Sequence, residues 1–153
     1  METWQFKSLF DEIAKMNSFK KDFGGWFTQS NECVLTLDLQ KSNYANYYEL
    51  NIKVYVHGMF GKEYIISKEL IKKDTGDVFR RQPKEFNDVL DLDNPMIENL
   101  RKERLHSLFA NFITPFTKMA LSKSGIKKLA EDRAVILLPA VKAELSKLMS
   151  ENQ

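Results

Sequence analysis

Two neighbouring stretches, residues 33–40 and 47–57, alternate apolar and polar residues, and this pattern constrains the fold more than any other feature of the chain. Successive side chains of a β-strand point to opposite faces, so each stretch predicts a strand with one apolar and one polar face. The short connection between them favours an antiparallel pair. Because an antiparallel sheet can keep one face in water, we expect helices to cover the apolar face and to leave the polar face open.

Shorter segments on either side extend the predicted sheet to about four strands. Residues 26–29 follow a Gly-Gly turn signal, and residues 77–81 carry a second short strand pattern. Strands that follow one another through short connections form an antiparallel meander. The rest of residues 58–94 has no clear period, so the sequence assigns no firm element there.

Apolar residues at spacings of three and four predict helices before and after the sheet. The first helix spans about residues 3–16, with Thr3 as its N-cap. A long helix begins at Asp93-Asn94-Pro95, Pro115 kinks or ends it, and two shorter helices follow. The chain is therefore predicted to be α+β, with an N-terminal helix, an antiparallel sheet and C-terminal helices on one face of the sheet. Its length favours one domain over residues 1–150.

The composition excludes several classes of protein. The 23 basic and 21 acidic residues give a net charge of +2, which favours neither a nucleic acid nor a membrane surface as partner. A single cysteine excludes an internal disulfide and any metal site built from several cysteines. The N-terminus lacks the pattern of a secretory signal, and the longest apolar run, residues 134–141, is far shorter than the roughly 20 residues that a bilayer requires. We therefore expect a cytoplasmic protein with no membrane contact.

Positive charge is concentrated in residues 101–153, which hold 10 basic and 5 acidic side chains. The sequence favours a solvated helical surface as the reason, with an anionic partner as the alternative. Nucleic-acid binding is not favoured, because Phe109, Phe112 and Phe116 belong to the apolar stripe of the long helix and offer no stacking surface.

Motifs of catalysis are missing from the sequence, and we expect neither an enzyme nor a cofactor. The chain has no phosphate-binding glycine loop, no nucleophile elbow and no zinc-protease motif. Cys33 shares the apolar face of its predicted strand, which favours a core thiol over a nucleophile beside His57 or His106. The acidic segment of Glu85, Asp88, Asp91 and Asp93 lacks the glycine and the closing glutamate of a calcium loop, so we predict no metal site. Asp93 is better explained as a helix cap.

The polar face of the two long strands is the first candidate binding surface. Tyrosine, tryptophan, asparagine and lysine side chains combine rigid area with hydrogen bonding, as recognition surfaces do. The alternative is that an exposed sheet face is polar in any case. The candidate residues on this surface are Trp26, Asp38, Gln40, Asn51, Lys53, Tyr55 and His57.

Two strand ends form the second candidate. Gln40-Lys41-Ser42 closes one strand, and its side chains can also simply satisfy the turn backbone. Arg80 and Arg81 are neighbours on a strand, so their guanidinium groups lie on opposite faces. The one on the helix side is expected to have a carboxylate partner, which favours a structural role for the pair.

The order of three segments resembles a known family. Phe23-Gly24-Gly25-Trp26 leads into the strand that ends in Gln40-Lys41-Ser42, and Tyr48-Glu49-Leu50-Asn51-Ile52-Lys53-Val54 follows. This arrangement resembles the bacterial domain-of-unknown-function family 4304 over about residues 5–120. The resemblance implies an α+β fold and no established activity.

The sequence therefore favours a non-catalytic domain that holds a protein partner on its open polar sheet face, in the manner of an inhibitor or an immunity protein. The alternative is an enzyme or small-ligand protein with a pocket between the sheet and the long helix, and with Tyr55, His57 and Arg81 at its mouth. A third alternative is a homo-oligomer formed through an exposed sheet edge.

Overall fold

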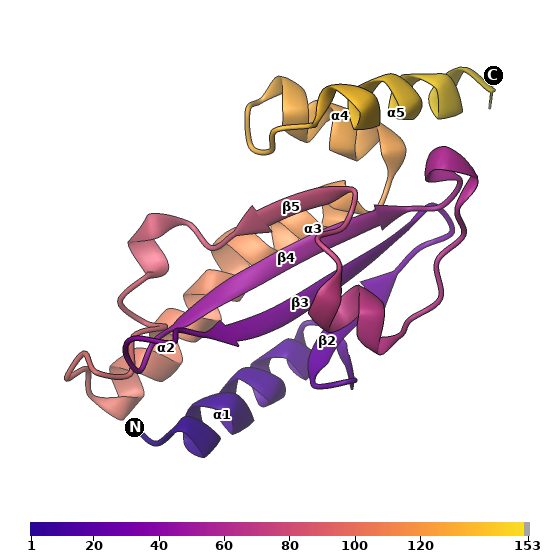
Figure 1. The fold of residues 1–153 in the computed structure, drawn as a ribbon. Coiled ribbons are helices and arrows are strands. Elements are labelled where there is room, and N and C mark those ends of the chain that lie inside the picture. Colours follow the sequence, from indigo (N-terminus) through magenta and orange to yellow (C-terminus); the bar gives the residue numbers. More distant parts are fainter. Residues whose placement is uncertain (152–153) are drawn as a thin grey trace.

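A computed structural model describes residues 1–151 and contains a five-stranded antiparallel sheet (Figure 1). The strands lie in the order β1-β2-β3-β4-β5, which confirms the predicted meander. There is one strand more than predicted, because β1 has three exposed residues and no alternating pattern. The strands are β1 (Lys20–Asp22), β2 (Gly25–Gln29), β3 (Cys33–Lys41), β4 (Tyr48–Val56) and β5 (Val78–Arg81).

The β1–β2 hairpin explains the Gly-Gly signal. Phe23 and Gly24 form its two-residue loop with φ of 50° and 75°, the backbone that a tight type I′ hairpin turn requires. Gly25 has a different reason to lack a side chain, because a Cβ there would overlap the carbonyl oxygen of Leu37 on β3. The missing side chain at Gly25 therefore allows β2 to lie close against β3.

Helices precede and follow the sheet, as predicted. Within the described residues, none of them has both the length and the apolar character needed to cross a membrane. They are α1 (Thr3–Met16), α2 (Glu98–Leu108), α3 (Thr114–Ala120), α4 (Lys123–Glu131) and α5 (Pro139–Glu151). Short helical turns are η1 (Met59–Gly61), η2 (Glu69–Lys73), η3 (Lys84–Phe86) and η4 (Phe109–Ile113).

Helix ends differ from the predicted caps. Glu2, not Thr3, caps α1, and its backbone N–H donates to Gln5 Oε1 at 3.0 Å. The helix expected from Asp93 begins only at Glu98, so Asp93 is not its cap. Asp93 instead accepts a hydrogen bond from the backbone N–H of Asn46 at 3.1 Å. The acidic segment thus joins two loops.

The long helix passes Pro115 without ending. Its middle turn, η4, is a π-helix, and α3 continues from Thr114 to Ala120. Proline removes one backbone donor, and a widened turn directly before it accommodates that loss. The predicted kink or stop at Pro115 is therefore replaced by a continuous rod of three helical segments.

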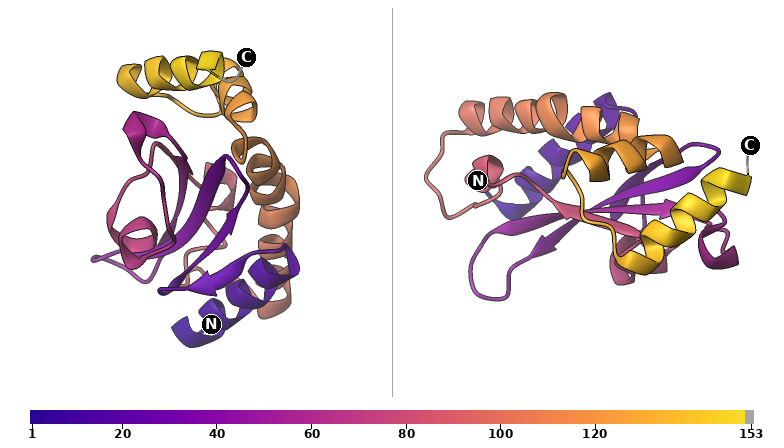
Figure 2. Two further views of the ribbon diagram at one scale, coloured as in Figure 1. Left: turned by 90° about the vertical axis from the view of Figure 1, so that its right-hand side faces the viewer. Right: turned by 90° about the horizontal axis from the view of Figure 1, so that it is seen from above.

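The main core lies between the apolar sheet face and the helices. Figure 2 shows α1, α2 and α3 on one side of the sheet. Leu37 and Val54 are fully buried on this side, which confirms the predicted apolar face. Phe10 of α1 contacts Trp26 and Phe109, with ring centroids 4.6 and 5.3 Å apart.

A second layer covers part of the other sheet face, contrary to the sequence prediction. Residues 62–77, here called the strap, cross this face and contain η2 (Figures 1 and 2). Val34, Tyr55 and Leu70 form a small separate apolar cluster between sheet and strap. Both faces of the central strands are therefore buried, and the face expected to remain open is closed over part of its length.

Candidate binding site

The polar face of β3 and β4 is not a free surface. Asp38, Asn51, Lys53 and Tyr55 are each less than 7% exposed, so the prediction that they face water is wrong. The alternation of residues correctly placed Lys53 and Tyr55 opposite the main core, but it carried no information about the strap. These side chains are therefore unavailable to a partner while the strap is in place.

The strap is held through its main-chain oxygens. Tyr55 Oη donates to the carbonyl of Leu70 at 2.6 Å, and Lys53 Nζ donates to that of Ile71 at 2.9 Å. The last carbonyls of a short helix have no partner within the helix, so these two donors satisfy them. Burial lowers the pKa of Lys53 and raises the pKa of Tyr55.

Further contacts attach the second half of the strap to the sheet and join its two ends to each other. Lys72 Nζ pairs with Asp38 Oδ1 at 2.5 Å. Tyr64 Oη donates to Asp77 Oδ1 at 3.2 Å, and the Val56 N–H donates to the other oxygen of Asp77 at 2.9 Å. Burial is the largest cause of the raised pKa of Asp77, and the two hydrogen bonds partly oppose it. The polar face is therefore the anchor of the strap.

His57 lies at the end of β4 beside the strap and is half-buried. Its Nδ1 lies 3.0 Å from Glu63 Oε2 and 3.3 Å from the backbone nitrogen of Tyr64. Both neighbours belong to the strap, so the contacts of this predicted site residue are internal to the fold.

The structure brings together three predicted residues at the end of the polar face. Asn51 Nδ2 donates to Gln40 Oε1 at 2.8 Å, and Arg81 Nε donates to Asn51 Oδ1 at 3.2 Å. Gln40, Lys41 and Arg81 are exposed, while Ser42 is half-buried and its Oγ accepts the Tyr44 N–H within the turn. Gln40, Lys41 and Arg81 are therefore the exposed part of the predicted surface, whereas Asn51 is buried.

Trp26 lies on the opposite face from the one predicted. It pairs with Leu37 across the strands and is buried in the main core. Its indole Nε1 donates to Asp11 Oδ1 of α1 at 2.9 Å. Trp26 is therefore a core residue that ties β2 to α1.

Arg80 and Arg81 point to opposite faces, as predicted. Arg80 is half-buried on the helix side, but the expected carboxylate partner is replaced by other groups. Its guanidinium donates to the carbonyl of Ala134 at 2.6 Å and lies 4.5 Å from the ring centroid of Phe112. Burial lowers the pKa of Arg80. Arg80 therefore attaches the segment before α5 to the sheet.

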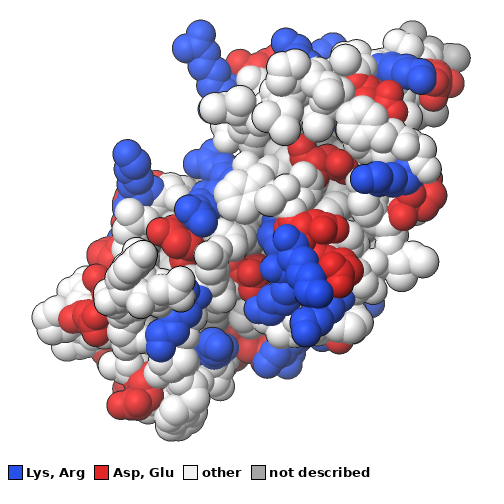
Figure 3. All heavy atoms as spheres, viewed as in Figure 1, with Lys and Arg blue, Asp and Glu red and all other residues white. Residues whose placement is uncertain are grey.

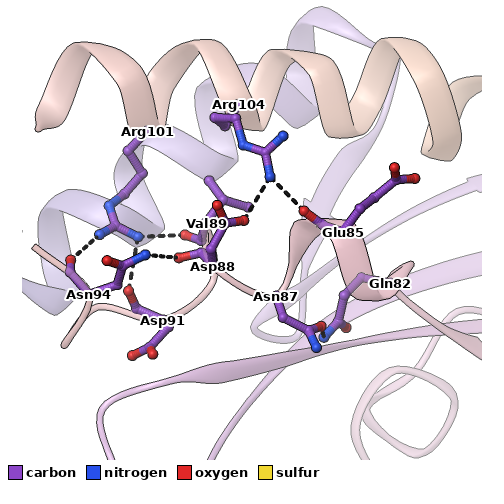
Figure 4. A network of polar contacts seen from close by, with 9 residues as sticks. All are labelled: Gln82, Glu85, Asn87, Asp88, Val89, Asp91, Asn94, Arg101 and Arg104. Atoms are coloured by element: carbon purple, nitrogen blue, oxygen red, sulfur yellow. Dashed lines mark hydrogen bonds and ion pairs between the residues drawn. The ribbon is translucent and has the colours of Figure 1, made fainter. Parts of the chain in front are cut away.

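Two arginines organise the acidic segment (Figure 4). Arg101, fully buried on α2, donates to the carbonyls of Val89, Asp91 and Asn94 at 2.7–3.1 Å. Arg104 pairs with Asp88 at 2.7 Å. No group of three or more metal-binding side chains occurs in the part of the chain that the structure describes.

A further cavity is lined by none of the predicted site residues. It is a groove of about 530 Å³ between α4 and α5, here called the α4–α5 groove. The expected mouth residues Tyr55, His57 and Arg81 do not line it. The residues that line it are Lys127, Ala130, Glu131, Arg133, Val135, Ile136, Leu137, Lys142, Leu145, Ser146 and Met149.

Exposed apolar side chains mark this groove. Ile136 is 88% exposed and Leu138 is 67% exposed, both in the segment that leads into α5. Leu138 lies outside α5, because the helix begins one residue later, at Pro139. In Figure 3, α4 and α5 form the upper part of the molecule, where uncharged atoms lie among charged side chains. The sequence analysis missed this site, and the apolar run of residues 134–141 is the signal that could have indicated it.

Basic side chains dominate the charge of the groove. Lys127 on α4, Arg133 on the connecting segment and Lys142 on α5 line it, against one acid, Glu131. Arg133 has φ of 61°, a left-handed backbone that favours glycine. The groove can therefore accept an apolar group that carries negative charge beside it.

The chain matches no protein-family model, and searches of curated proteins and of solved structures also find no match.

Proposed function

We propose that this chain is a non-catalytic binding domain that holds a protein partner in the α4–α5 groove. The observation that carries the proposal is the 88% exposure of Ile136, an isoleucine that lines the groove, with the 67% exposed Leu138 two residues further along the chain. Neighbouring apolar side chains that are exposed to water often mark a binding site, whereas single exposed apolar side chains are common on any protein surface. The groove replaces the sheet face as the docking surface, because the strap covers that face.

The partner is a segment of another protein and not a second copy paired along a sheet edge. The edge strand β1 consists of Lys20, Lys21 and Asp22, and β5 ends in Arg80 and Arg81. Short, charged edges oppose strand pairing between copies. The groove, in contrast, is bordered by two helices, which suits the insertion of apolar side chains from a partner.

A small apolar ligand is the second candidate occupant of the groove. It corresponds to the small-ligand protein that the sequence left as an alternative. The volume of about 530 Å³ lies within the range of small-molecule pockets, roughly 300–1,000 Å³. The groove does not lie between the sheet and the long helix, where the sequence analysis placed such a pocket. The resemblance to domain-of-unknown-function family 4304 and the cytoplasmic location stay predictions, and the proposal depends on neither.

Matched variants test the groove. Ile136→Asp places a charge beside it, and Ile65→Asp makes the same change at an 84% exposed isoleucine of the strap. A partner is first captured from native cells with the wild-type chain, identified and purified. Its binding to both variants is then measured by calorimetry.

We expect Ile136→Asp to weaken binding at least tenfold and Ile65→Asp to leave it unchanged. Equal affinity of the two variants would place the partner elsewhere and refute the groove as docking surface. Mass spectrometry of the chain purified from native cells tests whether a small apolar ligand is bound. If one small molecule per chain co-purifies with the wild type but not with Ile136→Asp, the groove binds a small ligand and the proposal of a protein partner is refuted.

A further inference from the structure

We infer that the segment bound in the α4–α5 groove is an acidic amphipathic helix, an inference that rests on the proposed function. Three cations reach the groove from three different elements, namely Lys127, Arg133 and Lys142. A partner with carboxylates beside its apolar side chains would match both the charge and the apolar lining.

These cations are not neutralised by the fold. Over residues 1–151, none of Lys127, Arg133 and Lys142 has a carboxylate within ion-pair distance. The neighbouring Lys128, in contrast, pairs with Asp132 at 3.2 Å. The positive side chains at the groove are therefore free to meet charges on a partner.

Arg133 supplies a second argument, because its backbone is strained. It follows the C-cap of α4, where its N–H donates to the carbonyl of Ala130 at 3.1 Å and the next N–H donates to that of Leu129 at 2.8 Å. Glycine usually occupies this position, since a Cβ disfavours a left-handed backbone. The chain carries a guanidinium here at a cost in stability, and over residues 1–151 that guanidinium has no ion-pair partner.

Positive charge continues from the groove toward the sheet. Arg133 and Ile136 also line a shallower hollow of about 360 Å³, together with Arg80 and Arg81 of β5. Acidic residues along one side of a bound helix would meet Arg133 first and Arg81 beyond it. The only acid that lines either hollow is Glu131, among the residues that the structure describes.

A helix suits this site better than an extended strand. The walls are two helices of 9 and 13 residues, so the groove can hold a helix of about three turns, or 16 Å. An added strand would need the free edge of β5, but Arg80 attaches the carbonyl of Ala134 beside that edge. Side chains at spacings of three and four would then enter the groove from one face of the partner helix.

Two labelled peptides test the inference by fluorescence anisotropy with the full chain. Both have 14 residues and leucines at positions 2, 5, 9 and 12; one carries glutamate and the other lysine at the remaining polar positions. We expect the glutamate peptide to bind at least tenfold more tightly, and its affinity to fall as salt rises, because exposed charges are screened. Ile136→Asp should weaken its binding at least tenfold.

Arg133→Gly separates binding from stability. It removes the guanidinium and relieves the backbone, so we expect a severalfold loss of affinity for the glutamate peptide together with a Tm raised by about 2–4 °C. Ser18→Gly is the matched control, because Ser18 also has a left-handed backbone, with φ of 71°, and does not line the groove. It should raise Tm and leave the affinity unchanged.

The outcomes distinguish the two proposals. Equal affinity for both peptides, sensitive to Ile136→Asp, would overturn the acidic partner and keep the groove as a docking surface. If Ile136→Asp leaves peptide binding unchanged, both the acidic partner and the groove as docking surface are refuted. Tighter binding to phosphatidylglycerol vesicles than to the peptide, lost in Arg133→Gly, would overturn a protein helix in favour of an anionic membrane surface.

Discussion

Lys53 Nζ lies 2.9 Å from the main-chain oxygen of Ile71, beneath the strap. The amine therefore belongs to a contact between two layers of the fold, although its place in the strand pattern suggested a surface group. Tyr55 makes the neighbouring contact with Leu70. These two contacts turn the predicted recognition face into an internal interface.

Tyr55→Phe should destabilise the protein. The change leaves the carbonyl of Leu70 buried without a donor, which costs about 1–3 kcal/mol and lowers Tm by several degrees. Tyr44→Phe is the control, since Tyr44 is 96% exposed, and it should change the free energy of unfolding by less than about 0.5 kcal/mol. Identical thermal melts of the two variants would show that the strap does not depend on Tyr55.

Asp77 should make the strap more stable in acid. Its pKa is raised in the folded chain, so the folded state binds a proton more strongly than the unfolded state does. The stabilisation from this proton is complete below the unfolded pKa of 3.8 and is lost as pH rises through the folded pKa. In urea titrations between pH 4 and 7, the free energy of unfolding of the wild type minus that of Asp77→Asn should increase toward low pH. A constant or falling difference would contradict the burial of this carboxylate.

Cys33 should be inert in the native protein. Burial raises the pKa of its thiol to about 12, so only about 10⁻⁴ of it is ionised at pH 8, and no part of the side chain is exposed. A coloured disulfide reagent should therefore label one thiol per chain in urea and almost none in buffer. Rapid labelling of the folded chain would reopen a nucleophilic role for this residue.

Gly125→Ala should weaken the junction of α3 and α4. A Cβ at Gly125 would overlap the carbonyl oxygen of Met119, so the backbone of one helix must move. Overpacking of this kind costs about 1–3 kcal/mol in the free energy of unfolding, measured with urea. Ser124→Ala, at the exposed neighbouring position, is the control and should cost less than about 1 kcal/mol. Equal costs would mean that the junction can relax.

The sheet could be predicted because its signal is local. Alternation in residues 33–56 fixes which side chains share a face, and Leu37 and Val54 lie on the predicted side. The strap could not be predicted in this way, since η2 is a single irregular turn whose hold on the sheet depends on main-chain oxygens. A pattern of side chains contains no information about such contacts.

The site was harder to predict than the fold. The sequence correctly put Gln40 and Asn51 on one face and the guanidinium groups of Arg80 and Arg81 on opposite faces, but exposure is a property of the whole tertiary structure. The α4–α5 groove depends on where α5 begins and on how it lies beside α4. Ile136 and Leu138 resemble core residues in the sequence, but they lie in the segment before α5, which begins at Pro139, and both are exposed.

Arg101 has a consequence for how this chain can vary. Its guanidinium donates hydrogen bonds to the main-chain carbonyls of residues 89, 91 and 94, and not to their side chains. Arg101 therefore does not itself restrict these side chains, although Asp91 Oδ1 accepts the Asp93 N–H at 3.0 Å and Asn94 Nδ2 donates to the carbonyl of Asp88 at 3.4 Å. Only a planar, multiply donating group can reach all three oxygens from α2. We therefore expect position 101 to remain arginine in diverging sequences, even where residues of the surrounding loop are substituted.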